Sequence, residues 1–340
     1  MQILGFLLTI GLIYIIGAIF YAWWTDFLPK DTDLLESISE NTNQVIVRDT
    51  LSFLDWNIGY GGLGEESDFF YEGGVSVNMP KNIVKKNLRG IVQTLERFKD
   101  SIDFFLLQEV DIESKRTHWI NQFELISASL KSHDALFGKN YDVKYIPFPL
   151  TNPMGKVMSG IATWSKYKVK KGIRHSFKGN YNFPHNLFFL DRCFMLKRYP
   201  TKNGKELIVV NTHNSAYDDG SLKKKQMNQM RSILIEEFSI GNYVIIGGDW
   251  NQFPSEYRDK EKKNFRIPPN YPDLGWQCTY DPKTPTYRNL NEPYNPISTK
   301  TGLIDFYVVS PNVEVLNVST IDQQFKYSDH QPVLMKAVLK

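Results

Sequence analysis

The chain has 340 residues, of which 42% are hydrophobic and 14% aromatic, enough apolar material for a sizeable core. Its 40 basic and 37 acidic residues give a net charge of +3, which argues neither for nor against a polyanionic partner. The two cysteines, Cys193 and Cys278, exclude a disulfide framework and lack zinc-site spacing, so we expect two buried thiols rather than a bridge.

An uncharged apolar run occupies residues 3–24. As a helix it would be about 33 Å long, which matches a hydrocarbon core of about 30 Å, and Tyr21, Trp23 and Trp24 at its end are typical of an interfacial aromatic belt. A cleaved signal peptide is the alternative, but the basic n-region and small-residue cleavage site are missing. We expect a single-span membrane anchor, a tether over 25–44 and a catalytic domain over 45–340. Lys30 is flanked by acids, so the positive-inside rule gives no reason to hold this side in the cytoplasm, and we expect the domain on the extracytoplasmic side.

The first half of the domain is expected to contain strands that end in polar residues. Residues 45–58 predict a strand with Asn57 at its end, and an acidic, aromatic loop follows at 65–79. Apolar residues at helical spacing predict a helix over 83–98. The next buried strand ends at Glu109. A carboxylate there is costly unless it pairs or binds a metal, so Glu109 is the first candidate for a cation ligand.

A second helix is expected at about 119–130. Strands are expected at 141–148, 160–165, 167–176 and 187–198. The last of these contains Arg192 in an apolar run. Its guanidinium needs an anionic partner, which could be Asp191, a carboxylate of the site or a substrate phosphate.

The second half repeats the pattern of strands with polar ends. A strand at 206–210 leads to His213, a helix is expected at about 221–238, and the strand 243–246 is followed by two glycines, Asp249 and Asn251. At a strand end these last two side chains project to one side, where a carboxylate can take a proton or hold a cation. Taken alone, they equally suit an Asx turn.

Residues 252–300 show no clear period, and so long an irregular stretch indicates a functional segment or an insertion. Its most site-like residues are Thr284, Thr286, Tyr287 and Arg288. Asp305 then lies in a strand predicted at 303–309, and Asp329 and His330 precede a last strand at 333–339. We expect Asp305 to orient the imidazole of His330, leaving Asp329 to contact metal or solvent.

In chain order, six motifs resemble the endonuclease/exonuclease/phosphatase superfamily over about 45–340. They are Trp56-Asn57, Gln108-Glu109, Thr212-His213, Gly248-Asp249-Trp250-Asn251, Ile304-Asp305-Phe306 and Ser328-Asp329-His330. Members include deoxyribonucleases, apurinic endonucleases, neutral sphingomyelinases and inositol polyphosphate 5-phosphatases. The resemblance implies an α/β (α+β) fold, a four-layer sandwich of two mixed β-sheets flanked by helices, here preceded by a transmembrane helix.

The resemblance also implies a metal-dependent phosphoester hydrolase, with a role for each motif. Glu109 and Asn57, with Asp329 as a further candidate, would bind Mg²⁺, for which Mn²⁺ could substitute. The remaining roles belong to side chains around the phosphate: Asp249 and Asn251 would position or activate water, His330 oriented by Asp305 would be the general base or stabilise charge, His213 would be its counterpart, and Arg192 would contact a phosphate oxygen.

Two substrate classes stay open. The acidic loop and the membrane anchor favour a phospholipid headgroup or a nucleotide, whereas Lys223–Lys225 and the lysines at 260, 262 and 263 could line a nucleic-acid path. A non-catalytic binding or scaffold domain on the same fold is the alternative to an enzyme. Such a domain would normally lack site carboxylates or histidines, and none is missing here. We expect a monomer.

Overall fold

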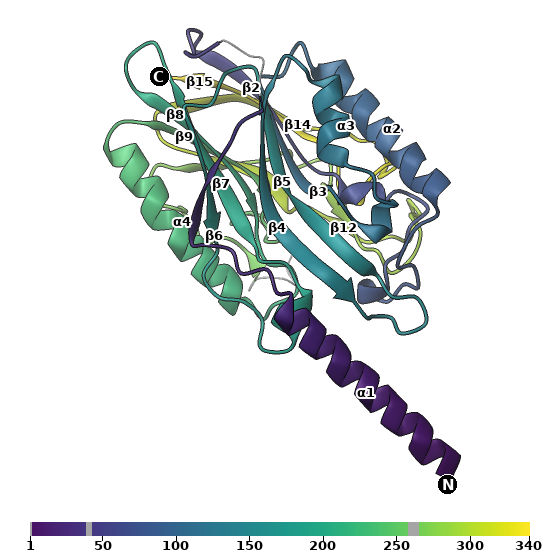
Figure 1. Cartoon of the computed structure of the whole chain (residues 1–340). Coiled ribbons are helices and arrows are strands. Elements are labelled where there is room, and N and C mark those ends of the chain that lie inside the picture. The colour runs from purple at the N-terminus through teal and green to yellow at the C-terminus, as the bar shows by residue number, and fades with distance from the viewer. Residues whose placement is uncertain (1, 39–42, 258–264) are drawn as a thin grey trace.

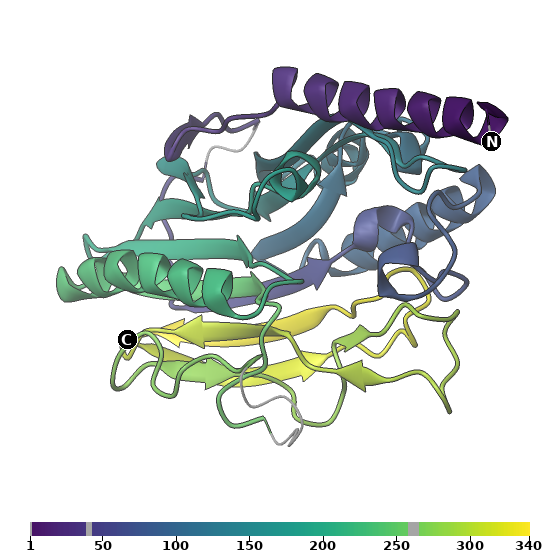
Figure 2. The same ribbon diagram turned by 90° about the horizontal axis from the view of Figure 1, so that it is seen from below.

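The computed structural model describes residues 2–38, 43–257 and 265–340, and two β-sheets packed face to face form its centre (Figure 1, Figure 2). In spatial order, the six-stranded sheet contains β14 (Val313–Thr320), β15 (Val333–Leu339), β2 (Thr50–Asn57), β3 (Phe104–Asp111), β5 (Gly155–Ser165) and β4 (Asp134–Ile146). The seven-stranded sheet contains β1 (Thr32–Leu35), β6 (Lys171–Ser176), β7 (Cys193–Pro200), β8 (Glu206–His213), β9 (Tyr243–Asp249), β13 (Asp305–Val309) and β10 (Gln277–Thr279).

Helices cover the outer faces of both sheets. The helices of the domain are α2 (Lys81–Phe98) and α3 (Gln122–Ser129) on the six-stranded sheet, and α4 (Ser221–Ser239) on the seven-stranded sheet. Short elements complete the described chain: η1 (Gly59–Gly61), η2 (Phe70–Glu72), η3 (Lys115–Thr117), η4 (His185–Phe188) and the small pair β11 (Tyr287–Arg288) and β12 (Thr301–Gly302).

Three apolar layers hold the four layers of secondary structure together. Because neighbouring strand residues face opposite sides, Phe53 packs between the sheets while Trp56 packs toward α2 and α3. Trp250 fills the layer under α4, where its indole stacks on Phe306 at a centroid distance of 5.0 Å. Both sheets contain parallel and antiparallel pairs. The predicted sandwich of two mixed sheets flanked by helices is therefore confirmed.

Each half contains one parallel strand pair connected by a crossover helix. In the first half α2 connects β2 to β3, and in the second α4 connects β8 to β9. Parallel strands end at the same edge of a sheet. Asp305, at the start of the antiparallel β13, is paired with Asp249 at the end of β9, so it lies at this edge as well. The topology therefore collects most of the predicted polar strand ends in one region.

The N-terminal helix α1 (Gln2–Trp24) projects from this body (Figure 1). Of the helices in the described residues, it is the one long and apolar enough to cross a membrane, a test that a signal sequence near the N-terminus would also pass. Its carboxyl-terminal part contacts the domain, because Ile19 and Ala22 pack in an apolar cluster with residues of β4, β5 and η4.

Several element predictions were wrong at the margins of the sheets. Residues 32–35 of the predicted tether form β1, an edge strand paired with β6. Because all four residues of β1 are exposed or half-buried, they gave little hydrophobic periodicity. The apolar run predicted as a strand from residue 187 forms η4 and a short coil, and β7 begins only at Cys193. The run is apolar because it packs in the same apolar cluster as Ile19 and Ala22 of α1. The edge strand β14, interrupted by a bulge between Val315 and Asn317, was not predicted. Cys193 and Cys278 are both free thiols, of which Cys193 is buried as expected and Cys278 only partly so.

Candidate active site

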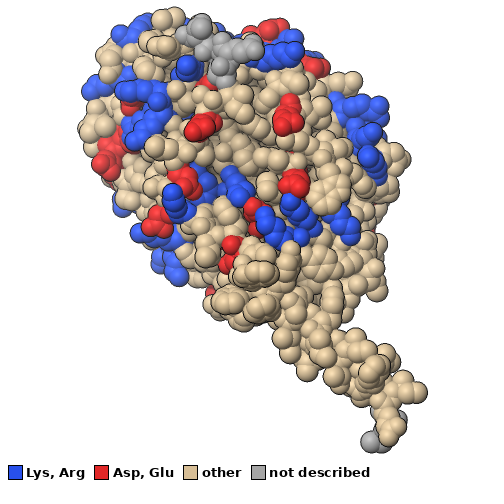
Figure 3. All heavy atoms as spheres, viewed as in Figure 1, with Lys and Arg blue, Asp and Glu red and all other residues tan. Residues whose placement is uncertain are grey.

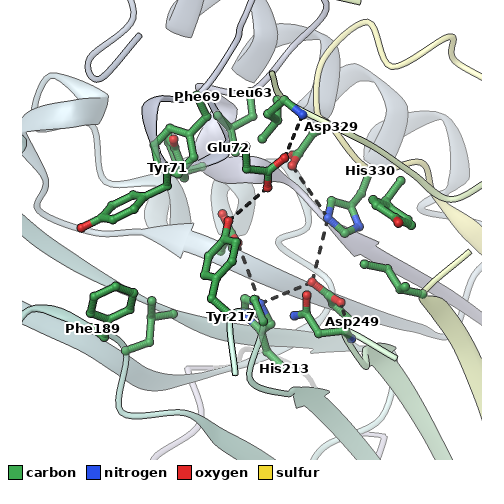
Figure 4. Close-up of a pocket in the computed structure, with 18 of the residues that line it drawn as sticks. Leu63, Phe69, Tyr71, Glu72, Phe189, His213, Tyr217, Asp249, Asp329 and His330 are labelled. Atoms are coloured by element: carbon green, nitrogen blue, oxygen red, sulfur yellow. Dashed lines mark hydrogen bonds and ion pairs between the residues drawn. The ribbon is translucent and has the colours of Figure 1, made fainter. Parts of the chain in front are cut away.

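A cavity of about 550 Å³ lies at the edge where the two parallel strand pairs, β2–β3 and β8–β9, end. All of the predicted site residues line it except Asn57 and Asp305, which lie directly behind lining residues. The lining residues that were predicted are Glu109, Arg192, His213, Asp249, Asn251, Asp329 and His330. Segments from both halves of the chain therefore meet around one space, and Figure 4 shows how several of these side chains face one another.

Asp249 lies between the two histidines (Figure 4). Its Oδ2 is 3.4 Å from Nε2 of His213 and 3.9 Å from Nε2 of His330, and it accepts a hydrogen bond of 3.0 Å from Nδ2 of Asn57. Its Oδ1 accepts one from the backbone N–H of Asn251. Burial raises the pKa of Asp249, but the hydrogen bond to His213 and the charge of His330 outweigh it and hold the pKa well below its ordinary value. Asp249 is therefore a carboxylate.

Asp305 and His330 form the expected buried pair. Nδ1 of His330 is 2.8 Å from Oδ2 of Asp305, which leaves Nε2 facing the cavity, 3.8 Å from Oδ2 of Asp329. Burial lowers the pKa of His330, but the carboxylates of Asp305 and Asp329 outweigh it, so the pKa is raised well above its ordinary value. His213 differs, because burial lowers its pKa and the neighbouring carboxylates do not compensate fully. The two histidines thus favour opposite protonation states.

The pH dependence of turnover tests the Asp305–His330 pair. We expect Asp305→Asn to move the limb of the kcat/KM profile that belongs to His330 to lower pH by about 1 to 3 units, because a neutral amide no longer raises the imidazole pKa. The measurement is the pH–rate profile of both proteins. Asp273→Asn, a half-exposed carboxylate outside the cavity, is the control and should leave the profile unchanged. An unshifted limb in Asp305→Asn would contradict the pairing.

Glu109 reaches the cavity from an irregular position in β3. The register of β3 against β5 shifts between Leu107 and Val110, and Glu109 has a φ of 55°. Such a bulge re-aims a side chain. Its Oε1 accepts a hydrogen bond of 3.3 Å from Nδ2 of Asn57 and lies 3.8 Å from Nε2 of His213. Tyr60 and Asn251, which also line the cavity, share the left-handed conformation, with φ of 42° and 48°.

The acidic side chains of the cavity suit a divalent cation. Burial raises the pKa of Asp329 to about 7, and the charge of Glu109 adds to this effect. Asp329 is packed closely, since a Cβ on Gly59 would come within 2.7 Å of its Oδ1. Buried carboxylates are costly unless a positive charge compensates them, and oxygen ligands are those that Mg²⁺ prefers. Asp249, Asp305 and His330 also have possible metal-ligand atoms within 4.8 Å of one another, but Asp305 and His330 are already paired with each other.

Asn57 presents its amide nitrogen, not its oxygen, to this acidic group. Nδ2 donates to Glu109 and Asp249, while Oδ1 accepts from the backbone N–H of Gly59 at 3.0 Å. In this orientation Asn57 positions the two carboxylates, and its role as a metal ligand stays a prediction.

Arg192 lies in the coil between η4 and β7, so its predicted place inside a strand was wrong. It lines the cavity, and its Nη1 is buried without a hydrogen-bond partner among the described residues. Asp191 is engaged elsewhere, because its Oδ1 accepts from Nδ2 of Asn180. Arg192 is thus placed to receive an anionic ligand.

Of the acids in the loop at 65–79, one lines the cavity. Glu65 and Glu66 both pair with Lys86, and Asp68 accepts from backbone N–H groups of its own loop. The acid that lines the cavity is Glu72, whose Oε1 accepts a hydrogen bond of 3.1 Å from the hydroxyl of Tyr217 (Figure 4). This contact joins the two halves across the cavity.

Arg116 also lines the cavity and was not predicted. Its guanidinium donates two hydrogen bonds to the carboxylate of Asp111 and lies 3.6 Å from the ring centroid of Tyr60. The sequence signal that could have indicated Arg116 was its position five residues after Asp111, the acid that ends the buried strand β3. Among the basic residues proposed for a nucleic-acid path, Lys223 is buried and paired with Asp218, and the lysines at 260, 262 and 263 lie outside the described residues.

Two mixed sheets between helices, with carboxylates and histidines gathered where the strands end, define the class of phosphoester hydrolase that the motifs indicated. The model of the Endonuclease/Exonuclease/phosphatase family matches residues 56–330, and the chain belongs to this family.

Comparisons with individual proteins agree with the family. A Phospholipase C of Staphylococcus aureus is 29% identical over 147 residues, which cover 39% of this chain and 42% of that protein. The endonuclease/exonuclease/phosphatase structure from Beutenbergia cavernae has a TM-score of 0.57 at 16% identity, covering 86% of this chain and 72% of that one. ANGEL2, a 2',3'-cyclic phosphatase, has a TM-score of 0.57 at 15% identity, covering 92% and 99%. These two likenesses show the shared fold.

Proposed function

We propose that the chain is a membrane-anchored, divalent-metal-dependent phosphodiesterase that cleaves the headgroup phosphodiester of a phospholipid. The observation that carries the hydrolytic part is the row of His213, Asp249 and His330 facing one cavity, with Asp305 behind His330. The limited likeness to a Phospholipase C supports a lipid over a nucleic acid. Glu72 supports it as well, because this acid of the loop 65–79 lines the cavity and would repel the many phosphates of a nucleic acid.

The opposite pKa shifts of the histidines support separate roles. Groups whose pKa values are pushed apart can divide acid and base work between them. His330, held protonated by Asp305, would donate a proton or a charge-assisted hydrogen bond from Nε2 to a phosphate or leaving-group oxygen. His213, held neutral by burial, would donate from Nε2 to Asp249 and keep that carboxylate in place. Asp249 is too weak a base to keep a proton, so it would orient the attacking water between them.

Glu109 and Asp329 would hold the cation, with Asn57 as the neighbouring amide. Bound there, Mg²⁺ would polarise a phosphoryl oxygen and compensate the carboxylate charges. Arg192 would hold a second phosphate oxygen through its unpartnered Nη1. Helix α1 would anchor the domain on the extracytoplasmic side. The mass of the protein purified from membranes distinguishes an anchor from a signal peptide, since an anchor is retained and a signal peptide is lost.

The test is a hydrolysis panel with the full chain in detergent micelles, with Mg²⁺ and with chelator. The panel contains sphingomyelin, phosphatidylcholine, inositol phosphates, bis-(p-nitrophenyl) phosphate, RNA and plasmid DNA. We expect chelator-sensitive release of phosphorylated headgroup from a phospholipid, with the plasmid intact. Nicking of the plasmid without lipid turnover would make the protein a nuclease. If a folded, metal-binding protein hydrolyses none of these substrates, the result would favour a binding or scaffold domain.

A further inference from the structure

Helix α1 does not simply end where the domain begins; it packs along one wall of it. Ile19 and Ala22 join an apolar cluster with Tyr141, Ile146 and Phe188, and farther along the helix the hydroxyl groups of Tyr14 and Tyr145 are 3.0 Å apart. The contact therefore extends over roughly half of the helix and reaches the end of β4.

The wall that α1 contacts is also the wall of the catalytic cavity. Six members of this apolar cluster line the cavity as well: Phe69, Tyr141, Met154, Phe188, Phe189 and Leu190. The candidate membrane helix and the cavity therefore share one apolar cluster of side chains.

The surface beside this wall exposes large apolar side chains. Phe148 and Leu150, in the loop 147–154 between β4 and β5, are 43% and 57% exposed, and Phe183 before η4 is 65% exposed. In Figure 3 the part of the body next to α1 is almost free of charged side chains, which gather farther from the helix. Large exposed apolar side chains on a surface poor in charge are typical of a protein or membrane interaction site.

The position of Tyr14 constrains how α1 can lie in a membrane. Tyr14 precedes Trp24 by ten residues, or about 15 Å along a helix, which is half of a hydrocarbon core of about 30 Å. If α1 stood upright with its tryptophans at the interface, Tyr145 and the neighbouring Lys144 would lie near the bilayer centre, where a charge is strongly disfavoured. Tilting α1 away from the membrane normal moves Tyr145 and Lys144 from the bilayer centre toward the interface, and it brings the loop 147–154 toward the headgroup layer.

We infer that the loop 147–154 and Phe183 lie in the interfacial layer of the bilayer beside a tilted α1, so that the cavity opens at the lipid surface. We call this surface the lipid-facing rim. The inference rests on the proposed membrane anchoring and adds that the body itself, and not only its helix, contacts lipid. Lipid phosphates would then reach the cavity without leaving the membrane surface.

The test places a nitroxide label on the rim of the full-length protein in phosphatidylcholine vesicles. Leu150→Cys carries the label in a Cys278→Ser background, since Cys193 is fully buried. Leu316→Cys is the matched control, because Leu316 is 50% exposed on β14, on the far side of the body from α1 (Figure 2). We expect a severalfold loss of accessibility to a water-soluble nickel complex at position 150 relative to position 316. Equal accessibility at both positions would overturn the inference.

A second pair of variants reads out function separately. Leu150→Asp should lose turnover of vesicle phospholipid severalfold and keep that of bis-(p-nitrophenyl) phosphate, whereas Leu316→Asp should keep both, since neither residue lines the cavity. Phe148→Asp repeats the test if Leu150→Asp fails to fold. If the label at position 150 is shielded but the protein does not hydrolyse phospholipid, the inferred lipid-facing rim stands and the proposed substrate is refuted. Lipid turnover with a water-exposed label would refute the rim alone.

Discussion

His330→Ala should lower kcat by about 10³-fold while leaving KM within a few fold, because it removes the group placed to transfer a proton and little of the binding surface. The buried carboxylate of Asp305 then loses its partner at 2.8 Å, so some stability is lost as well. Steady-state kinetics on the best substrate of the panel gives both constants.

Two further proteins make this result interpretable. His185→Ala, in η4 and outside the cavity lining, is the matched histidine control and should keep wild-type kinetics. The double variant Asp305→Asn, His330→Ala also removes the buried carboxylate that loses its partner in His330→Ala, so it should recover part of the stability but no activity. A kcat within tenfold of wild type in folded His330→Ala would remove His330 from the mechanism.

Glu109→Gln should weaken Mg²⁺ binding and turnover together, each by more than about 100-fold, because the change removes one negative charge from the group proposed to hold the cation. Higher Mg²⁺ or Mn²⁺ should restore part of the activity, whereas chelator should abolish it in both proteins. Titration calorimetry with Mn²⁺ measures the binding directly and does not depend on knowing the substrate.

The control for Glu109→Gln is Glu65→Gln, which removes a partly exposed carboxylate that pairs with Lys86 outside the cavity. It should bind metal as the wild type does. If Glu109→Gln also binds Mn²⁺ normally, the cation lies elsewhere, and Asp249 with Asp329 would be the next candidates.

The sequence predicted the central strands and the residues at their ends for a physical reason. Buried β-branched runs are visible locally, and a polar residue just after such a run stands out, as Asp249 does after β9. Crossover connections then bring the ends of β2, β3, β8 and β9 to one edge. The edge strands β1 and β14 escaped notice because half-exposed, polar strands lack that contrast.

The rest of the cavity depends on contacts between distant segments, which no local pattern contains. Glu72 and Tyr217 meet although 145 positions separate them. The run from Leu187 to Leu190 is apolar because it packs with α1 and the cavity wall, and a local pattern cannot distinguish that from a buried strand. Arg192 was therefore assigned to the wrong element although its expected place beside the phosphate stays open.

The left-handed backbone at Tyr60, Glu109 and Asn251 has a consequence for laboratory evolution. Each such residue costs roughly 1–3 kcal/mol relative to relaxed backbone, a strain that glycine would relieve. Selection for heat resistance alone should therefore accumulate glycine at Glu109 and Asn251 and give a more stable protein that has lost its chemistry. Tyr60 should stay, because its buried ring packs with Leu63 and Leu290 and its removal would leave a cavity. A screen that demands activity in every round would keep all three side chains and would have to find its stability elsewhere in the sandwich.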